Sequence, residues 1–247
     1  MLRTMGLAAL ISLGLAGWVS AQTVNDWMDR IDPADLQTGG IVLDLHHAGE
    51  VDGFMRFGWH ANGEEIVLWD RTMWASREIF ETYEAHVGLA GLDPRRVAIR
   101  FHQGETLYRF ATEFQEGEAL GYVLIERPGQ DEARQNLSAE LPQGSVLRAS
   151  VFMLAAILPL EVGEQIELDW YAPMDNAVSR VTLSAAEAVT IDTPDGPVDT
   201  IRLEQRGGQP PNDIFVVPGT RDVVRIDIVG QDLYFLARAG AEPAVTD

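Results

Sequence analysis

The sequence contains no cysteine and no lysine. Without cysteine, the chain has no disulfide bonds, thiolate zinc sites or cysteine nucleophiles. Without lysine, it has neither a phosphate-loop lysine nor a Schiff-base lysine. The motifs H-E-x-x-H, G-x-S-x-G and S-x-x-K are also absent, which removes the common templates of zinc proteases and serine hydrolases. The motifs leave open a triad assembled in space around another serine.

Apolar runs long enough to span a bilayer are absent too. The run from Met5 to Val19 follows a single cation, Arg3, and precedes the small residues Ser20 and Ala21. This pattern predicts a secretory signal peptide, residues 1–21, cleaved after Ala21. The run is shorter than the ~20 residues of a membrane span, and no cysteine follows it for a lipid anchor. We therefore expect an exported, periplasmic protein without a membrane span.

Positive charge is scarce. After removal of Arg3, 17 arginines remain against 38 acidic residues, a net charge of −21. This charge repels nucleic acid and anionic lipid headgroups within a Debye length of ~8–10 Å, so we expect no nucleic-acid partner. Cationic partners remain compatible with it, although a solvating surface is the simpler interpretation.

The main pattern in the sequence is an alternation of apolar and polar residues with a period of two. Residues 22–40 are expected to be a helical or linker segment, with a helix over 24–36 interrupted at Pro33 and ended by Gly39-Gly40. Residues 41–247 fit a single, mainly β domain. Apolar and polar residues alternate over short segments between glycine-containing turns, which predicts an antiparallel meander forming a barrel or half-barrel. The expected strands are 41–45, 55–59, 65–73, 76–86, 97–103, 106–114, 119–126, 165–171, 177–191, 198–205, 213–217, 223–229 and 233–238.

Three segments break this alternation. Residues 129–144 are polar and are expected to be a loop between two halves of the fold. Residues Ser145 to Leu158, with Ser145 as N-cap and Pro159 as stop, predict a helix that is apolar nearly all round and therefore buried, in the concavity of the sheet or at its mouth. Asp195-Gly196 predicts a hairpin turn, since glycine accepts a positive φ.

The second half resembles a known family in its turns. The series "FMLAAILPLEVGEQIEL" (152–168), "IDTPDGPVDTIRLE" (191–204) and "DIFVVPGTRDVVRIDI" (213–228), with "GLAGLDPRR" (88–96) in the first half, is similar to the exported β-rich proteins of the domain-of-unknown-function family DUF3108. Phe215 stands where that family often has tryptophan, and Asp222-Val223-Val224 replaces its usual proline. The resemblance implies an open β half-barrel and brings no catalytic residue with it.

Candidate chemical groups are numerous but not specific. A glycosidase needs two carboxyl groups facing each other across a cleft, a condition that sequence spacing does not supply. Five aromatic residues are candidates for the lining of a ligand pocket, although Trp59 and Trp170, on the apolar face of their strands, are expected in the core. We therefore predict no catalytic residue and no cofactor. The acidic pairs are Glu64-Glu65, Glu167/Asp169 and Asp192/Asp195, and the aromatic candidates are Trp59, Trp69, Trp74, Trp170 and Tyr171.

The five histidines lie in the first half of the chain, three of them within "LDLHHAGEVDGFMRFGWH", residues 43–60. Neighbouring residues in a strand point to opposite faces, which separates His46 from His47 and puts His47 in the core or at its rim. A hairpin places His60 opposite residue 40 or 42, roughly 13 to 20 Å from His46 at ~3.3 Å per residue. His102 is in reach of one of the two only, and the fifth is His86. The pattern therefore predicts no metal site.

Three function classes follow. The leading hypothesis is a non-enzymatic envelope protein whose concave face, with the helix over residues 145–158, binds an apolar ligand or a protein partner. The alternative is an envelope hydrolase that acts on a glycan or ester through carboxylate and histidine side chains. A third is a purely structural or assembly role.

Overall fold

One large, mostly antiparallel sheet makes up the fold. The computed structural model describes residues 21–240, so the predicted signal peptide, apart from Ala21, lies outside the described residues. The sheet has the strand order β1-β11-β12-β13-β14-β15-β16-β2-β3-β4-β5-β6-β7-β8-β9, and β10 pairs with β11. The strands of the first half are β1 (Gln22–Thr23), β2 (Thr38–His47), β3 (Glu50–Asn62), β4 (Glu65–Trp74), β5 (Ile79–Gly88), β6 (Pro94–Gln103), β7 (Thr106–Gln115), β8 (Glu118–Glu126) and β9 (Ala133–Glu140). The strands of the second half are β10 (Val146–Leu147), β11 (Glu164–Ala172), β12 (Ala177–Thr193), β13 (Gly196–Arg206), β14 (Asn212–Val216), β15 (Val223–Ile228) and β16 (Leu233–Ala237).

The predicted antiparallel meander is confirmed. From β2 to β9 each strand pairs with the next along the chain, and β11 to β16 do the same. The ladder between β16 and β2 joins the two series into one sheet. The predicted hairpin also forms, with Thr193 paired to Gly196 around Pro194 and Asp195.

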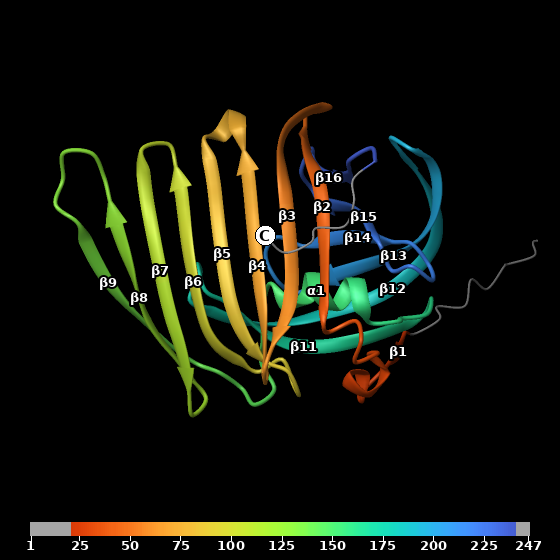
Figure 1. Cartoon of the computed structure of the whole chain (residues 1–247), viewed down its shortest axis with the longest axis horizontal. Coiled ribbons are helices and arrows are strands. Elements are labelled where there is room, and N and C mark those ends of the chain that lie inside the picture. The colour runs from red at the N-terminus through yellow and green to blue at the C-terminus, as the bar shows by residue number, and fades with distance from the viewer. Residues whose placement is uncertain (1–20, 241–247) are drawn as a thin grey trace, which may run out of the picture.

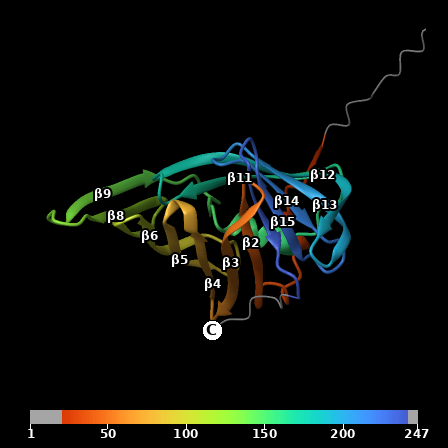
Figure 2. The same ribbon diagram turned by 90° about the horizontal axis from the view of Figure 1, so that it is seen from above.

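The sheet curls over itself without closing. Figure 1 shows β2 to β9 side by side, with β11 to β14 running across behind them, and Figure 2 shows β11 and β12 above the plane of β6, β8 and β9. No ladder of the described residues joins the edge strand β9 to the other end of the sheet. Across the opening, Asn176 in the turn between β11 and β12 donates through Nδ2 to the Ser138 carbonyl of β9 at 3.0 Å. Of the two predicted forms, the open one is therefore observed.

The predicted buried helix is present but shorter. Helix α1 (Ser150–Ile157) lies between the two faces of the curled sheet (Figure 1), and all its residues except Phe152 are buried. The expected N-cap at Ser145 is wrong: Val146 and Leu147 instead pair in parallel with β11. Ser145 Oγ donates to the Pro142 carbonyl at 2.7 Å. The apolar pattern assigned Val146 and Leu147 to the first turn of the helix, but these residues form a strand that pairs with β11.

Two other boundaries differ from expectation. A 3₁₀ helix, η1 (Trp27–Arg30), replaces the longer helix of residues 24–36, and Gly39-Gly40 lie inside β2 rather than at a helix end. Gly39 is needed there because a Cβ atom would lie 2.1 Å from the ring of Trp59. The expected loop 129–144 contains β9, an edge strand. Most of its side chains are exposed, so the alternation of apolar and polar residues that marks a half-buried strand is weak there.

The helices do not include a membrane span. Within residues 21–240, neither α1 nor the 3₁₀ turns η1 and η2 (Ala75–Arg77) have the length and apolar character needed to cross a bilayer.

Candidate functional site

A cavity of about 370 Å³ lies between α1 and the concave face of the sheet. Strands β2 to β6 form one wall, and β14 to β16 with the segments around β10 and β11 form the other. Most of its surface is apolar. The apolar lining side chains include Leu45, Met55, Phe57, Trp74, Ile79, Ile99, Phe152, Met174, Ile226, Leu233 and Phe235.

Two carboxyl groups project into this apolar space from neighbouring strands. Asp70 on β4 is directly opposite Tyr83 on β5, and Thr72 is opposite Glu81. The four residues therefore share one face of the sheet, with Asp70 and Glu81 in diagonal positions, whose Cβ atoms are typically ~7–8 Å apart. The hydroxyl of Thr72 donates to Asp70 Oδ2 at 2.9 Å and lies 3.1 Å from Oδ1. All four residues line the cavity.

Burial controls the protonation of this pair. It raises the pKa of Asp70 well above its ordinary value, and the neighbouring charge of Glu81 raises it further, against the hydrogen bond from Thr72. Burial also raises the pKa of Glu81, while the positive charge of Arg148 lowers it. An ionised carboxylate loses water there without gaining a direct counterion. The cavity therefore holds acidic groups that take up protons more readily than those on the surface.

Arg148 enters the cavity wall because β10 fixes its backbone. Its amide donates to the Tyr171 carbonyl at 3.0 Å, directly after the parallel β10–β11 pairing. Its guanidinium carbon lies 5.9 Å from the ring centroid of Trp170. Among the described residues, the guanidinium nitrogens of Arg148 form no ion pair with Asp70 or Glu81. Arg148 thus acts on the two carboxyl groups through space.

Two buried polar atoms at the cavity wall have no partner among the described residues. Tyr83 is 8% exposed, and its hydroxyl makes no hydrogen bond. Asn212 is 2% exposed, and its Oδ1 accepts none. The amide nitrogen of Asn212 donates to Gln205 Oε1 at 2.7 Å and to the Pro210 carbonyl at 3.2 Å, which leaves the oxygen as the free atom. Buried polar atoms are almost always hydrogen-bonded, so unpaired ones need a reason.

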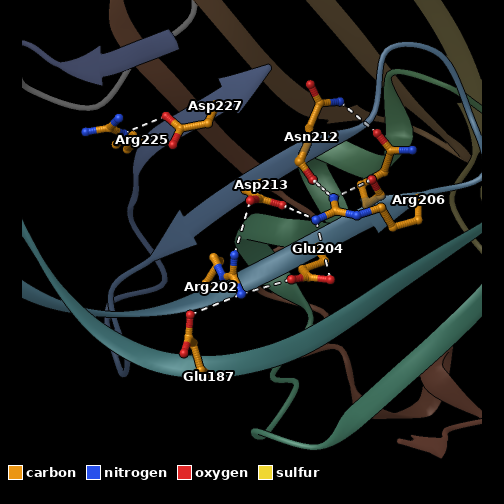
Figure 3. A network of polar contacts seen from close by, with 9 residues as sticks. Glu187, Arg202, Glu204, Arg206, Asn212, Asp213, Arg225 and Asp227 are labelled. Atoms are coloured by element: carbon orange, nitrogen blue, oxygen red, sulfur yellow. Dashed lines mark hydrogen bonds and ion pairs between the residues drawn. The ribbon is translucent and has the colours of Figure 1, made fainter. Parts of the chain in front are cut away.

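Charges on the outer face are arranged differently. Figure 3 shows arginines and acids of β12, β13 and β14 in contact with one another, and Arg206 of this group also donates to the Asn212 carbonyl at 2.8 Å. Arg202 lies 3.0 Å from Glu187, 2.9 Å from Glu204 and 3.3 Å from Asp213. Arg206 lies 2.5 Å from Asp213. This outer network is paired throughout, whereas the acids in the cavity are not.

The predicted aromatic residues separate into two groups. Trp59, Trp170 and Tyr171 are buried, as expected for core residues. Trp59 Nε1 donates to the Asp35 carbonyl at 2.8 Å, and Tyr171 donates to Asn176 at 2.9 Å. Trp69 packs against Gly58, where a Cβ atom would lie 2.4 Å from its ring. Of the five candidates, Trp74 alone lines the cavity.

Asp52, which does not itself line the cavity, holds the cavity-lining side chain of Trp74 in place. Its Oδ2 accepts a hydrogen bond from Trp74 Nε1 at 2.8 Å and lies 3.6 Å from His47 Nδ1. The hydroxyl of Ser76 also donates to Asp52, and this bond is the largest cause that lowers the carboxyl pKa. The His47 side chain is 36% exposed and packs edge-on against Trp74, so of the two predicted positions, core or rim, it occupies the rim.

The other histidines lie apart. His60 pairs with Thr38, not with residue 40 or 42 as predicted. A two-residue turn, Ala48-Gly49, and a register shift between Leu45 and His46 move the pairing by two residues. His46 stacks on Tyr234, with ring centroids 4.8 Å apart.

Two histidines lie further along the meander. The ring centroid of His102 lies 6.5 Å from that of Phe80. His86 is buried on the outer face, 2.9 Å from Glu65 and 3.3 Å from Glu84. Within residues 21–240, no group of three or more His, Asp or Glu side chains is suited to a metal ion.

The predicted acidic pairs do not form the site. Arg180 on the outer face lies 2.9 Å from both Glu167 and Asp169, and none of the predicted pairs lines the cavity. Sequence reasoning missed Asp70 and Glu81. The signal was their position: Asp70 follows Ile66 and Leu68 at spacing two, and Glu81 precedes Tyr83, Ala85 and Val87 in the same way. An acid on the apolar face of a strand deserves a functional explanation more than an adjacent pair on a polar face.

No family model matches the chain, and no curated protein matches it in sequence. Among solved structures, the chain is similar to the crystal structure of a beta-barrel-like protein of domain of unknown function DUF1849 from Brucella abortus. The two share 8% sequence identity at a TM-score of 0.42, and the match covers 81% of this chain and 94% of that chain. This neighbour does not bear on the resemblance to DUF3108, which stays a prediction.

Proposed function

We propose that the protein is an exported, non-enzymatic envelope protein that binds a small, largely apolar ligand in the cavity between α1 and the sheet. The observation that carries this proposal is the cavity itself, which encloses about 370 Å³ behind mostly apolar side chains. Small-molecule sites are concave, mostly apolar and equipped with a few polar groups that orient the ligand. Asp70, Glu81 and Arg148 are such groups. The cavity favours a small ligand over a protein partner as the occupant of the concave face.

The hollow also argues against a purely structural role. Protein interiors are normally packed like organic crystals, and an unfilled space costs stability. Placing two carboxyl groups in such a space costs more, because neither has a direct counterion. A chain selected only for stability would fill the space with apolar side chains. A bound ligand would offset both costs.

Native mass spectrometry of mature protein purified from its own cell envelope tests the proposal. We expect a co-purified small molecule or, after delipidation, a one-to-one shift on addition of a fatty alcohol such as decanol. The matched control is Ala149→Phe, which places a ring in the cavity wall just before α1. Binding that is absent from wild-type protein, or unchanged in Ala149→Phe, would refute the cavity as the ligand site.

A hydrolase is the second candidate, and one observation favours it. Asp70 and Glu81 share a cavity, and the pKa of each is raised, as required of a general acid that works near neutral pH. No histidine lines the cavity in the described part of the chain, so the carboxyl groups would act alone. Turnover of glycan or ester substrates that disappears in Asp70→Asn would support this candidate. The apolar lining favours binding over hydrolysis of a polar glycan.

A further inference from the structure

Among the polar atoms that face the cavity, several hydrogen-bond acceptors have no donor. Ionised carboxylates accept hydrogen bonds and donate none, so Asp70 and Glu81 present acceptors. The Thr72 hydroxyl and the Arg71 backbone amide donate to Asp70. The free Oδ1 of Asn212 is a further acceptor, and the buried hydroxyl of Tyr83 has no partner. The cavity therefore offers more acceptors than the described residues satisfy.

The charged groups that line the cavity do not sum to zero. When both carboxyl groups are ionised, Asp70, Glu81 and Arg148 sum to one negative charge, and Arg148 forms no direct ion pair with either acid within residues 21–240. The neighbours in register with the pair are apolar: Met55 and Phe57 on β3, and Ile99 and Phe101 on β6. Low-polarity surroundings strengthen the attraction of the pair for a cation.

We propose that the ligand carries a cationic nitrogen on its apolar body and that this head group lies between Asp70 and Glu81. The inference rests on the proposed function and adds the chemical class of the ligand. An ammonium group supplies the missing positive charge and, where it bears N–H bonds, the missing donors. The apolar body then lies against Phe57, Phe152 and the other apolar lining residues.

An anionic head group fits this site poorly. It would pair with Arg148, but Asp70 and Glu81 line the same cavity and repel it unless both are protonated. A neutral head group satisfies some acceptors but leaves the net negative charge uncompensated. For ligands with the same apolar chain, we therefore expect the affinity to be highest for a cationic head group, lower for a neutral one and lowest for an anionic one.

Three ligands with one decyl chain test this ranking: decyltrimethylammonium, decanol and decanoate. Each is titrated calorimetrically into the mature protein below micellar concentrations, at an alkaline pH at which both carboxyl groups are ionised. We expect decyltrimethylammonium to bind roughly tenfold or more tighter than decanol, because its charge is attracted to the carboxylates in low-polarity surroundings although it donates no hydrogen bond, and decanoate to bind most weakly. Decanol reports on the proposed function itself. If decanol binds and the cation does not bind tighter, the head-group inference fails while the cavity proposal stands. If none of the three binds, the proposed function fails.

Two variants separate the charges of the site. Asp70→Asn with Glu81→Gln should lower the affinity for decyltrimethylammonium roughly tenfold or more and leave that for decanol nearly unchanged. Arg148→Gln should raise the affinity for the cation, because it removes the competing positive charge. The matched control, Glu167→Gln with Asp169→Asn, removes the same charge from the outer face and should change neither affinity. Loss of cation binding in Arg148→Gln, or equal losses in the control, would overturn the inference.

The pH dependence adds a test without mutation. The quaternary ammonium does not titrate, so a change in its affinity reports on the groups that face it, which are Asp70 and Glu81, with Tyr83 and Arg148 beside them. Because the pKa values of both carboxyl groups are raised, cation affinity should fall on acidification at a pH above the ordinary carboxyl range. Affinity that is constant down to the ordinary carboxyl range would contradict the assignment.

Discussion

The interior of this protein has two unlike parts. Around α1 it is filled: Met153, Leu154 and Leu158 are fully buried, and the guanidinium of Arg221 caps the Ala155 carbonyl at 2.8 Å. Beyond Phe152 the interior contains the cavity, which is lined by Asp70 and Glu81. The same sheet lines both parts. The difference shows where side chains are placed for packing and where they are placed for another purpose.

The filled part should be the more sensitive to truncation, which gives the largest expected effect. Leu154→Ala should lower the free energy of unfolding by about 3 kcal/mol, since a new void adds to the lost transfer energy. Leu233→Ala at the cavity should cost less, about 1–2 kcal/mol, because that side chain already borders empty space. Urea denaturation measures both. A larger loss for Leu233→Ala would remove the distinction between the two parts.

Neutralising the carboxyl groups of the hollow part should have the opposite sign. Asp70→Asn with Glu81→Gln should raise the free energy of unfolding at pH 7 by about 1–2 kcal/mol, because two poorly compensated charges are replaced by neutral groups. The control pair Glu167→Gln with Asp169→Asn removes contacts to Arg180 and should not stabilise the protein. Destabilisation by the cavity variant would mean that the two acids hold the fold together.

The stabilisation should depend on pH. A raised pKa means that the folded state keeps a proton which the unfolded state has already lost, so stability from Asp70 and Glu81 rises as pH falls through their folded-state pKa values. The advantage of the double variant over wild type should therefore shrink between pH 7 and pH 5. Asp52, whose pKa is lowered, contributes stability that is lost only at more acidic pH. An advantage that is constant over this range would contradict the raised pKa values.

The smallest effect is expected on the outer network. Arg202→Gln removes contacts to Glu187, Glu204 and Asp213 and should cost about 1 kcal/mol or less, since partly exposed ion pairs are screened by water and salt. Denaturation at low and high salt should show the cost shrinking as salt is added. A cost above that of Leu154→Ala would reverse the comparison between packing and surface charge.

The strands and the buried helix could be predicted because alternation and apolar continuity are local signals. Strand β9 escaped prediction because most of its side chains are exposed and its one apolar face, Ala133, Leu137 and Ala139, is interrupted by Gln135. The register of His60 escaped because a tight turn and a bulge set it, not the apolar pattern. Asp70 and Glu81 were visible as acids on apolar faces, but their proximity depends on the β4–β5 register. Arg148 joins them only through the pairing of β10 with β11.

Calorimetric titration of mature protein with decanol, beside Ala149→Phe, tests the central claim most directly. We predict one molecule bound per chain with a negative heat-capacity change, the mark of apolar burial, and at least tenfold weaker binding to the variant if the variant keeps the wild-type circular dichroism spectrum. Absence of binding to the wild-type protein, or equal binding to both proteins, would contradict the claim that the hollow is a ligand site.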